Sequence, residues 1–275
     1  MTDARPALVD ELVASGVERR EARWLVEEFV PGGEGARDAL ADAAKRRLAG
    51  EPLQYVVGHW PFRDLDLDLD ARVLIPRPET EELVDVALAV LARAAVSAPL
   101  ILDLGCGSGA IGLALVSELD DRGVRATLVG VDRSRDALAV ARSNAAKHHV
   151  TSASFVVSSW FSDLDASLRG RCDLVVANPP YVGADEISEL DEVLAYEPRH
   201  ALVARDARGV AGFADVEHVL SHVRDWLVPG GSVVLEHGYA QGSAALEVAS
   251  GAGLVDATDV TDMSGRPRVL VARRA

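Results

Sequence analysis

The spacing of hydrophobic and polar positions changes twice along the chain. Over residues 1 to about 50, apolar residues recur at helical spacing in ALVDELVASG, EARWLVEEFV and ARDALADAAKRRLAG. Between residues 55 and 75 the period falls to two, most clearly in RDLDLDLDARVLI, which predicts a half-buried strand in a hairpin. The proline-bracketed IPRPET then predicts the start of a helix that continues through EELVDVALAVLARA.

From residue 99 onward, apolar strand patterns alternate with helical patterns. The predicted strands are PLILDLG, ATLVGVD, ASFVVSS, CDLVVANPP, VPGGSVVLEHG, LVDATDV and RPRVLVARR. Such alternation is typical of an α/β fold with a parallel sheet that helices cover on both faces. We therefore expect a helical domain at 1–52, a β-hairpin linker at 53–76 and an α/β domain at 77–275.

Composition and charge narrow the functional classes. The chain has 275 residues, of which 49% are hydrophobic, so it can form one large core and one small core. Its two cysteines cannot form a disulfide framework, and without a cysteine and histidine cluster we expect no metal site. With 43 acidic and 28 basic residues, the net charge is −15, which disfavours direct nucleic-acid binding.

The beginning of the chain lacks a basic signal-peptide start, and LVDVALAVLARAAV is too short to span a bilayer, so we expect a cytoplasmic protein without a membrane segment.

Candidate chemistry lies where the predicted strands end, since ligands of open α/β sheets bind at that edge. The first strand runs into DLGCGSGAIG, where Gly105, Gly107 and Gly109 allow a tight turn and a close approach of the backbone to a ligand. Asp103 comes just before this loop. The second strand ends in Asp132, whose carboxylate can accept both hydroxyls of a ribose.

The glycine loop fits two cofactors. Gly107, Gly109 and Gly112 also match the dinucleotide fingerprint, so a nicotinamide enzyme remains an alternative. However, Asp103 would repel a pyrophosphate, whereas it suits the ammonium and sulfonium cations of S-adenosylmethionine. The loop therefore favours S-adenosylmethionine.

The fourth strand ends in Asn178, Pro179, Pro180 and Tyr181. Two prolines donate no N–H and end the strand, so that the Asn178 side chain and the Pro179 carbonyl can face a ligand. Both are acceptors, and together they can hold the two hydrogens of a planar NH2 group while Tyr181 stacks on it. Acceptors placed for a pyramidal nitrogen favour the transition state. The motif predicts methyl transfer to a planar amine.

These motifs, together with GEPLQYVVGHWPFRDLDLDLDARVLIPRPETEELVD, resemble the HemK/PrmC family of N(5)-glutamine methyltransferases, which modify peptide chain release factors. The resemblance covers nearly the whole chain. It implies a helical N-terminal domain that docks the release factor, a hairpin linker, and a class I (Rossmann-like) seven-stranded methyltransferase domain whose last strand is antiparallel. The implied substrate is the glutamine of the factor's Gly-Gly-Gln loop, and the implied products include S-adenosylhomocysteine.

The resemblance also implies roles for individual residues. Glycines 105, 107 and 109 with Asp103 would line the methionine end of the cofactor, Asp132 the ribose and Trp160 the adenine. Asn178 would also border the cofactor. The glutamine amide would be held by Asn178, Pro179, Pro180 and Tyr181, and Arg77 and Glu79 would form part of the wall between linker and active site. We expect the enzyme to act as a monomer.

Two departures from the family pattern bear on these roles. Ser159 stands where the family has an aspartate, so a contact with the adenine amino group would come from Asp163. The ARDARGVAGF segment at 204–213 replaces a Gly-Gly and Asp-Gly-Leu pattern. A paralogue with another protein target therefore remains an alternative. An adenine N(6) methyltransferase is disfavoured by the acidic charge and by the lack of an inserted target-recognition domain.

Overall fold

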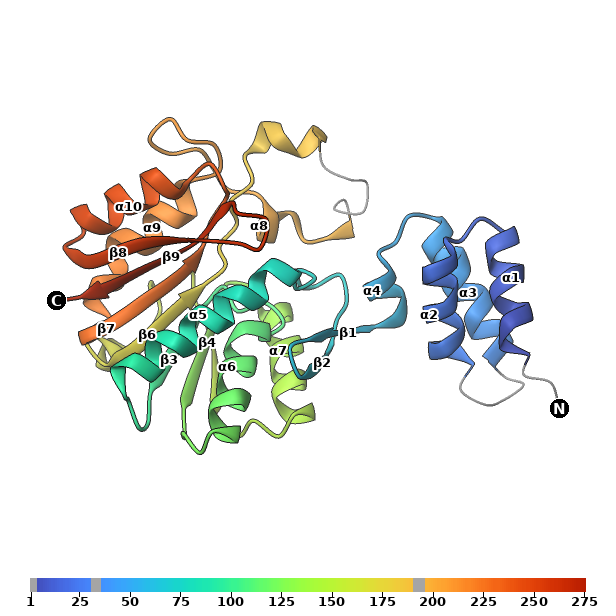
Figure 1. Cartoon of the computed structure of the whole chain (residues 1–275), viewed down its shortest axis with the longest axis horizontal. Helices are drawn as coiled ribbons and strands as arrows, with labels where there is room; N and C mark the ends of the chain where they lie inside the picture. Colours follow the sequence, from blue (N-terminus) through green and yellow to red (C-terminus); the bar gives the residue numbers. More distant parts are fainter. Residues whose placement is uncertain (1–3, 31–35, 190–195) are drawn as a thin grey trace.

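The computed structural model describes residues 4–30, 36–189 and 196–275. They form a small helical lobe and a larger α/β lobe (Figure 1). The small lobe consists of α1 (Arg5–Ala14), α2 (Arg19–Phe29) and α3 (Ala36–Leu48), followed by the short α4 (Leu53–Val57). These helices bury one shared apolar core, which confirms the helical periodicity. Its buried members are Leu8, Val9, Leu12, Val17, Ala22, Leu25, Val26, Leu40, Ala43, Ala44, Leu53 and Val56.

The predicted hairpin consists of β1 (His59–Phe62) and β2 (Leu65–Asp68), which pair antiparallel. Leu65 and Leu67 are buried in the core of the larger lobe, as the alternating pattern requires. The intervening aspartates face outward, and Lys147 Nζ lies 2.9 Å from Asp66 and 2.6 Å from Asp68. The hairpin is thus fixed to the larger lobe on both of its faces.

The larger lobe contains a seven-stranded sheet, as expected for the fold class. Its strands are β3 (Leu100–Leu104), β4 (Thr127–Asp132), β5 (Ala153–Val157), β6 (Cys172–Ala177), β7 (Leu227–Glu236), β8 (Leu254–Thr261) and β9 (Pro267–Arg274). Their order is β5-β4-β3-β6-β7-β9-β8. The first five are parallel, and β9 lies antiparallel between β7 and β8. The strand order reverses around β3, which places the switch point at the end of the glycine-loop strand.

Helices cover both faces of the sheet (Figure 1). On one face α5 (Pro78–Ala94), α6 (Ala110–Asp121) and α7 (Arg135–Lys147) pack on residues such as Ile101. On the other, α9 (Ala214–His222) and α10 (Gly242–Gly251) pack on residues such as Leu102. Side chains at successive positions of β3 therefore pack into the cores on opposite faces of the sheet, which explains why the strand is apolar at successive positions. Across the described ranges, no helix is both long and apolar enough to span a membrane.

Several short elements were not predicted, because one or two turns are too short to show a period. They are α8 (Arg199–Leu202), the 3-10 helices η1 (Ala166–Leu168) and η2 (Ala184–Glu189), and α4; a further 3-10 helix, η4 (Val223–Asp225), directly follows α9.

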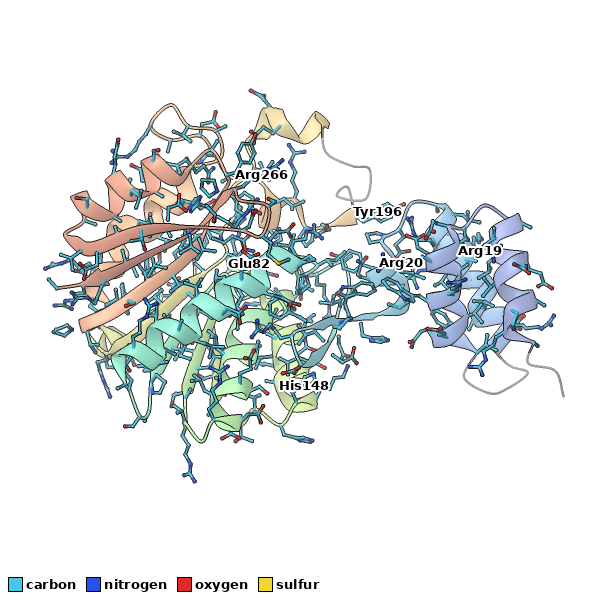
Figure 2. The ribbon with its side chains drawn as sticks, viewed as in Figure 1. Arg19, Arg20, Glu82, His148, Tyr196 and Arg266 are labelled. Atoms are coloured by element: carbon cyan, nitrogen blue, oxygen red, sulfur yellow. The ribbon has the colours of Figure 1, made fainter. Side chains whose placement is uncertain are left out.

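The residues just before α8 connect the two lobes. Tyr196 lies between the lobes (Figure 2), and its hydroxyl donates to the Ala49 carbonyl at 2.6 Å. Glu197 is buried and accepts hydrogen bonds from the Ile75 amide and from Arg77. A charged side chain is buried only where it is paired, so this contact fixes the linker against the segment that follows the NPPY motif.

Candidate active site

A cavity lies at the carboxyl ends of β3, β4 and β6, beside the switch point. Its volume is about 680 Å³, including the part that is open to solvent. Three segments far apart in the sequence meet there: the glycine loop, the linker and α8. The lining residues are Arg72, Val73, Leu74, Gly105, Gly107, Asp132, Arg133, Ala137, Ser158, Ser159, Trp160, Asn178, Pro180, His200, Ala201 and Asp215.

Backbone groups shape the glycine-loop wall. Gly105 and Gly107 have positive φ angles of 70° and 54°, a conformation that favours glycine. The Gly107 amide donates to Asp132 Oδ2 at 3.0 Å, and the Ser134 amide donates to Asp132 Oδ1 at 2.8 Å. Two backbone donors therefore fix the Asp132 carboxylate on the cavity wall, where a ribose was expected.

Asp103 lies behind the loop instead of on the wall. Its Oδ2 accepts from the Gly112 amide at 3.0 Å, and Oδ1 is buried without a partner in the described residues. The pKa of Asp103 is raised to about 7. Burial is the main cause and the Asp132 charge adds to it, while the hydrogen bond from Gly112 opposes the rise. Gly109 does not line the cavity either. Of the four residues expected at the methionine end, only Gly105 and Gly107 face the cavity.

Gly112, the last glycine of the dinucleotide fingerprint, has a packing role. A Cβ atom there would lie 2.9 Å from Asp103 Oδ2 and 2.7 Å from Leu128. Glycine at this position lets α6 pack tightly on β3 and β4.

Trp160, which was expected to pack on adenine, lines the cavity and has a partner that the sequence did not predict. Its Nε1 donates to Asp215 Oδ1 at 3.2 Å, and both side chains face the cavity. Ser159 also lines the wall, whereas Asp163 is exposed and does not. The carboxylate nearest the expected adenine site is therefore Asp215, at the start of α9.

The NPPY motif joins this cavity to a smaller one. Asn178 and Pro180 line both, while Pro179, Tyr181 and Arg77 line only the smaller. Asn178 Nδ2 donates to Thr80 Oγ1 at 3.1 Å. Among the described residues, none donates a hydrogen bond to Asn178 Oδ1 or to the Pro179 carbonyl. Two unused acceptors thus lie on neighbouring residues, one on a residue that lines both cavities and one on a residue that lines the smaller.

Tyr181 is held at both ends. Its hydroxyl donates to Glu236 Oε1 at 3.1 Å, and its carbonyl accepts from Gln241 Nε2 at 3.0 Å. Burial and the Glu236 charge raise the pKa of Tyr181, so it stays neutral and can donate. The Arg268 guanidinium carbon lies 5.8 Å from the centre of the tyrosine ring.

The two residues expected in the wall behave differently. Arg77 lines the smaller cavity and pairs with the buried Glu197. Glu79 is exposed in the first turn of α5 and lines neither cavity.

Comparison with known proteins identifies the family. A methyltransferase-domain family model matches residues 97–255. The release factor glutamine methyltransferase of Salmonella typhimurium is 41% identical over 234 residues, covering 85% of this chain and 79% of that protein. The protein of the same name from Escherichia coli is 35% identical over 280 residues, covering 96% and 95%. The chain belongs to the release factor glutamine methyltransferase family. Membership confirms the resemblance and the methyltransferase class.

Solved structures support the fold. A methyltransferase from Pyrococcus furiosus has a TM-score of 0.54 at 15% identity, covering 86% of this chain and 99% of that one. A ribosomal protein L11 methylase from Lactobacillus delbrueckii has a TM-score of 0.50 at 18% identity, covering 75% and 84%. At this identity, the likeness confirms only the fold class.

The segment around residues 203–213 packs directly on the NPPY motif and the residue that follows it. Val182 forms a parallel bridge with Val203. Gly212 has a φ of 62°, and a Cβ atom there would lie 2.3 Å from the Tyr181 carbonyl oxygen. The 204–213 loop thus leaves no room for a side chain between Gly212 and the NPPY motif.

Proposed function

We propose that this enzyme transfers a methyl group from S-adenosylmethionine to the side-chain amide nitrogen of the glutamine in the Gly-Gly-Gln loop of a peptide chain release factor. The observation that carries the proposal is the pair of unused acceptors, Asn178 Oδ1 and the Pro179 carbonyl, on two residues of which Asn178 lines both cavities and Pro179 the smaller one. The larger cavity is lined by the residues expected to bind the cofactor, and the smaller one by Tyr181. This arrangement matches a primary amide presented to a bound methyl donor.

The larger cavity fits S-adenosylmethionine. The Asp132 carboxylate can accept ribose hydroxyls, the Trp160 indole offers a flat surface for adenine, and Gly105 and Gly107 leave room beside it. The unpartnered Oδ1 of Asp103, buried behind the loop, suits a nearby cation. When bound, S-adenosylmethionine supplies an electrophilic methyl group, and S-adenosylhomocysteine remains after transfer.

The residues of NPPY would prepare the amide nitrogen. Its lone pair is delocalised, so the nitrogen becomes nucleophilic only as it pyramidalises. Asn178 Oδ1 and the Pro179 carbonyl would accept one hydrogen each and favour that geometry, and Tyr181 would stack on the amide plane. No side chain needs to remove a proton before transfer, because the nitrogen becomes acidic only once methylated and can then lose its proton to water.

The remaining parts of the chain would present the substrate. We propose that residues 1–52 dock the release factor, that the linker at 53–76 sets its distance from the cavity, and that Arg77 and Glu79 border the approach. We also propose that the enzyme acts as a monomer in the cytoplasm, without binding nucleic acid.

Mass spectrometry of a purified release factor, incubated with the enzyme and S-adenosylmethionine, tests the proposal. We expect one methyl group on the glutamine of the Gly-Gly-Gln loop and none on a factor with that glutamine replaced by alanine. A methyl group elsewhere, or none while S-adenosylmethionine still binds, would instead indicate another protein target and would contradict the proposed substrate.

A further inference from the structure

A buried hydrogen-bond network lies beneath the NPPY motif. Glu236, the last residue of β7, uses both carboxylate oxygens in it. Oε2 accepts from the Thr80 hydroxyl at 2.8 Å, and Oε1 accepts from the Tyr181 hydroxyl at 3.1 Å. Thr80 in turn accepts from Asn178 Nδ2 at 3.1 Å. Thr80 and Glu236 are only 3% and 1% exposed, so neither can contact a substrate directly.

The proton count of this network fixes the orientation of the Asn178 amide. A threonine hydroxyl carries one hydrogen, and an ionised carboxylate can only accept. Thr80 therefore gives its hydrogen to Glu236 and offers a lone pair to Asn178. Only the NH2 end of the Asn178 side chain can use that lone pair, so Oδ1 must point away from Thr80.

The opposite orientation would not support the reaction. With its amide turned over, Asn178 would present two N–H donors to a substrate NH2 group that is itself a donor. Asparagine rotamers that differ by such a flip have nearly the same shape, so packing alone discriminates poorly between them. The orientation of the Asn178 amide must therefore be set by hydrogen bonding, and the lone pair that Thr80 offers sets it.

The direction of the network depends on an ionised Glu236. Burial and the Glu79 charge raise the pKa of Glu236, while the hydrogen bonds from Thr80 and Tyr181 and the charge of Arg268 oppose the rise. A protonated Glu236 could donate to Thr80 and reverse the network, so these three groups help to keep its direction.

We propose that Thr80 and Glu236 are positioning residues that hold Asn178 Oδ1 toward the substrate amide, through one chain of hydrogen bonds from the end of β7 to the end of β6. The same carboxylate fixes the Tyr181 hydroxyl, so both sides of the amide site depend on one buried group. This inference rests on the proposed function, because it assigns Asn178 the role of acceptor.

Two substitutions of Thr80 separate this role from packing. Thr80→Val keeps the branched shape and removes the hydroxyl, whereas Thr80→Ser keeps the hydroxyl and removes a methyl group. A positioning role predicts that Thr80→Val lowers kcat by about 10- to 100-fold with the Kd for S-adenosylmethionine within about twofold, and that Thr80→Ser retains nearly full kcat. A packing role predicts the reverse order, with Thr80→Ser the more impaired, and that order would overturn the proposal.

Coupling to Asn178 provides the second measurement. If Thr80 acts through Asn178, Thr80→Val should lower kcat in the wild type but add less than about twofold in an Asn178→Ala background. If Thr80→Val lowers kcat by the same factor in the wild type and in the Asn178→Ala background, the proposal is overturned. This comparison holds even if Thr80→Val makes the protein less stable. Wild-type turnover on a release factor is measured first: its absence contradicts the proposed function, whereas wild-type turnover with an unaffected Thr80→Val variant contradicts only the positioning role.

Discussion

The cofactor end and the substrate end of the site are built differently. At the cofactor end, Asp132 is held by the amides of Gly107 and Ser134, which are 25 and 2 residues away in sequence. At the substrate end, Asn178 is held by Thr80, and Thr80 by Glu236, across separations of 98 and 156 residues. Asp132 is held by backbone amides at the ends of two neighbouring strands, whereas Asn178 is held by side chains from elements far apart in the sequence. Substitutions at the two ends should therefore affect different steps.

Asn178→Ala should give the largest effect, and we expect it on the transfer step. Without Oδ1, one hydrogen of the substrate amide loses its acceptor in the transition state. We expect kcat to fall by about 10²- to 10⁴-fold, with the Kd for S-adenosylmethionine changed by less than about threefold. Steady-state kinetics and calorimetry measure the two quantities, and an unchanged kcat would refute the role of Asn178.

Gly212→Ala tests whether the substrate end depends on the 204–213 loop. A Cβ atom would collide with the Tyr181 carbonyl, so the loop or the motif must shift. We expect kcat to fall by about tenfold or more and stability to fall by roughly 2 kcal/mol or more.

Gly209→Ala is the matched control. Gly209 has a φ of 73°, and no atom lies within 4 Å of the place that its Cβ would occupy, so the variant should lose only about 1 kcal/mol and keep its kcat. Equal losses of kcat in the two variants would show that loop strain, and not contact with Tyr181, matters.

Asp103→Asn tests the buried carboxylate behind the glycine loop through its pH dependence. Burial raises the pKa of Asp103 to about 7 from 3.8, so its stabilising contribution is complete below 3.8 and is lost as the pH rises through about 7. Relative to Asp103→Asn, the unfolding free energy of the unliganded wild type should fall by about 2–3 kcal/mol between pH 5 and pH 8. Chemical denaturation at the two pH values measures this, and a constant difference between the proteins would show that Asp103 titrates normally.

Asp215→Ala should give the smallest effect, confined to the cofactor end. It removes the acceptor of the Trp160 indole N–H, so the ring loses one constraint. We expect the Kd for S-adenosylmethionine to rise about three- to tenfold with little change in kcat at saturation. Asp163→Ala, an exposed residue outside the cavity, is the control and should leave the Kd unchanged.

The same contrast explains what the sequence could predict. The strands, the glycine loop and Asp132 follow from local periodicity and spacing, and the structure has them at the predicted places. Asp215 and Glu236 were missed, because each acts through a partner 55 or more residues away and belongs to no local motif. Asp103 was expected on the cavity wall but lies behind the glycine loop. Spacing in the sequence predicts where a strand ends but not which way the side chain at its end faces.

Single-turnover methylation of a release factor across a range of S-adenosylmethionine concentrations tests the central claim most directly, when run on the wild type, Asp132→Ala and Asn178→Ala. It yields a half-saturating concentration and a limiting rate for each protein. We expect Asp132→Ala to raise the half-saturating concentration by about tenfold or more with a nearly unchanged limiting rate. We expect Asn178→Ala to lower the limiting rate with a nearly unchanged half-saturating concentration. If both variants changed the same parameter, the separation of cofactor and substrate ends would be wrong.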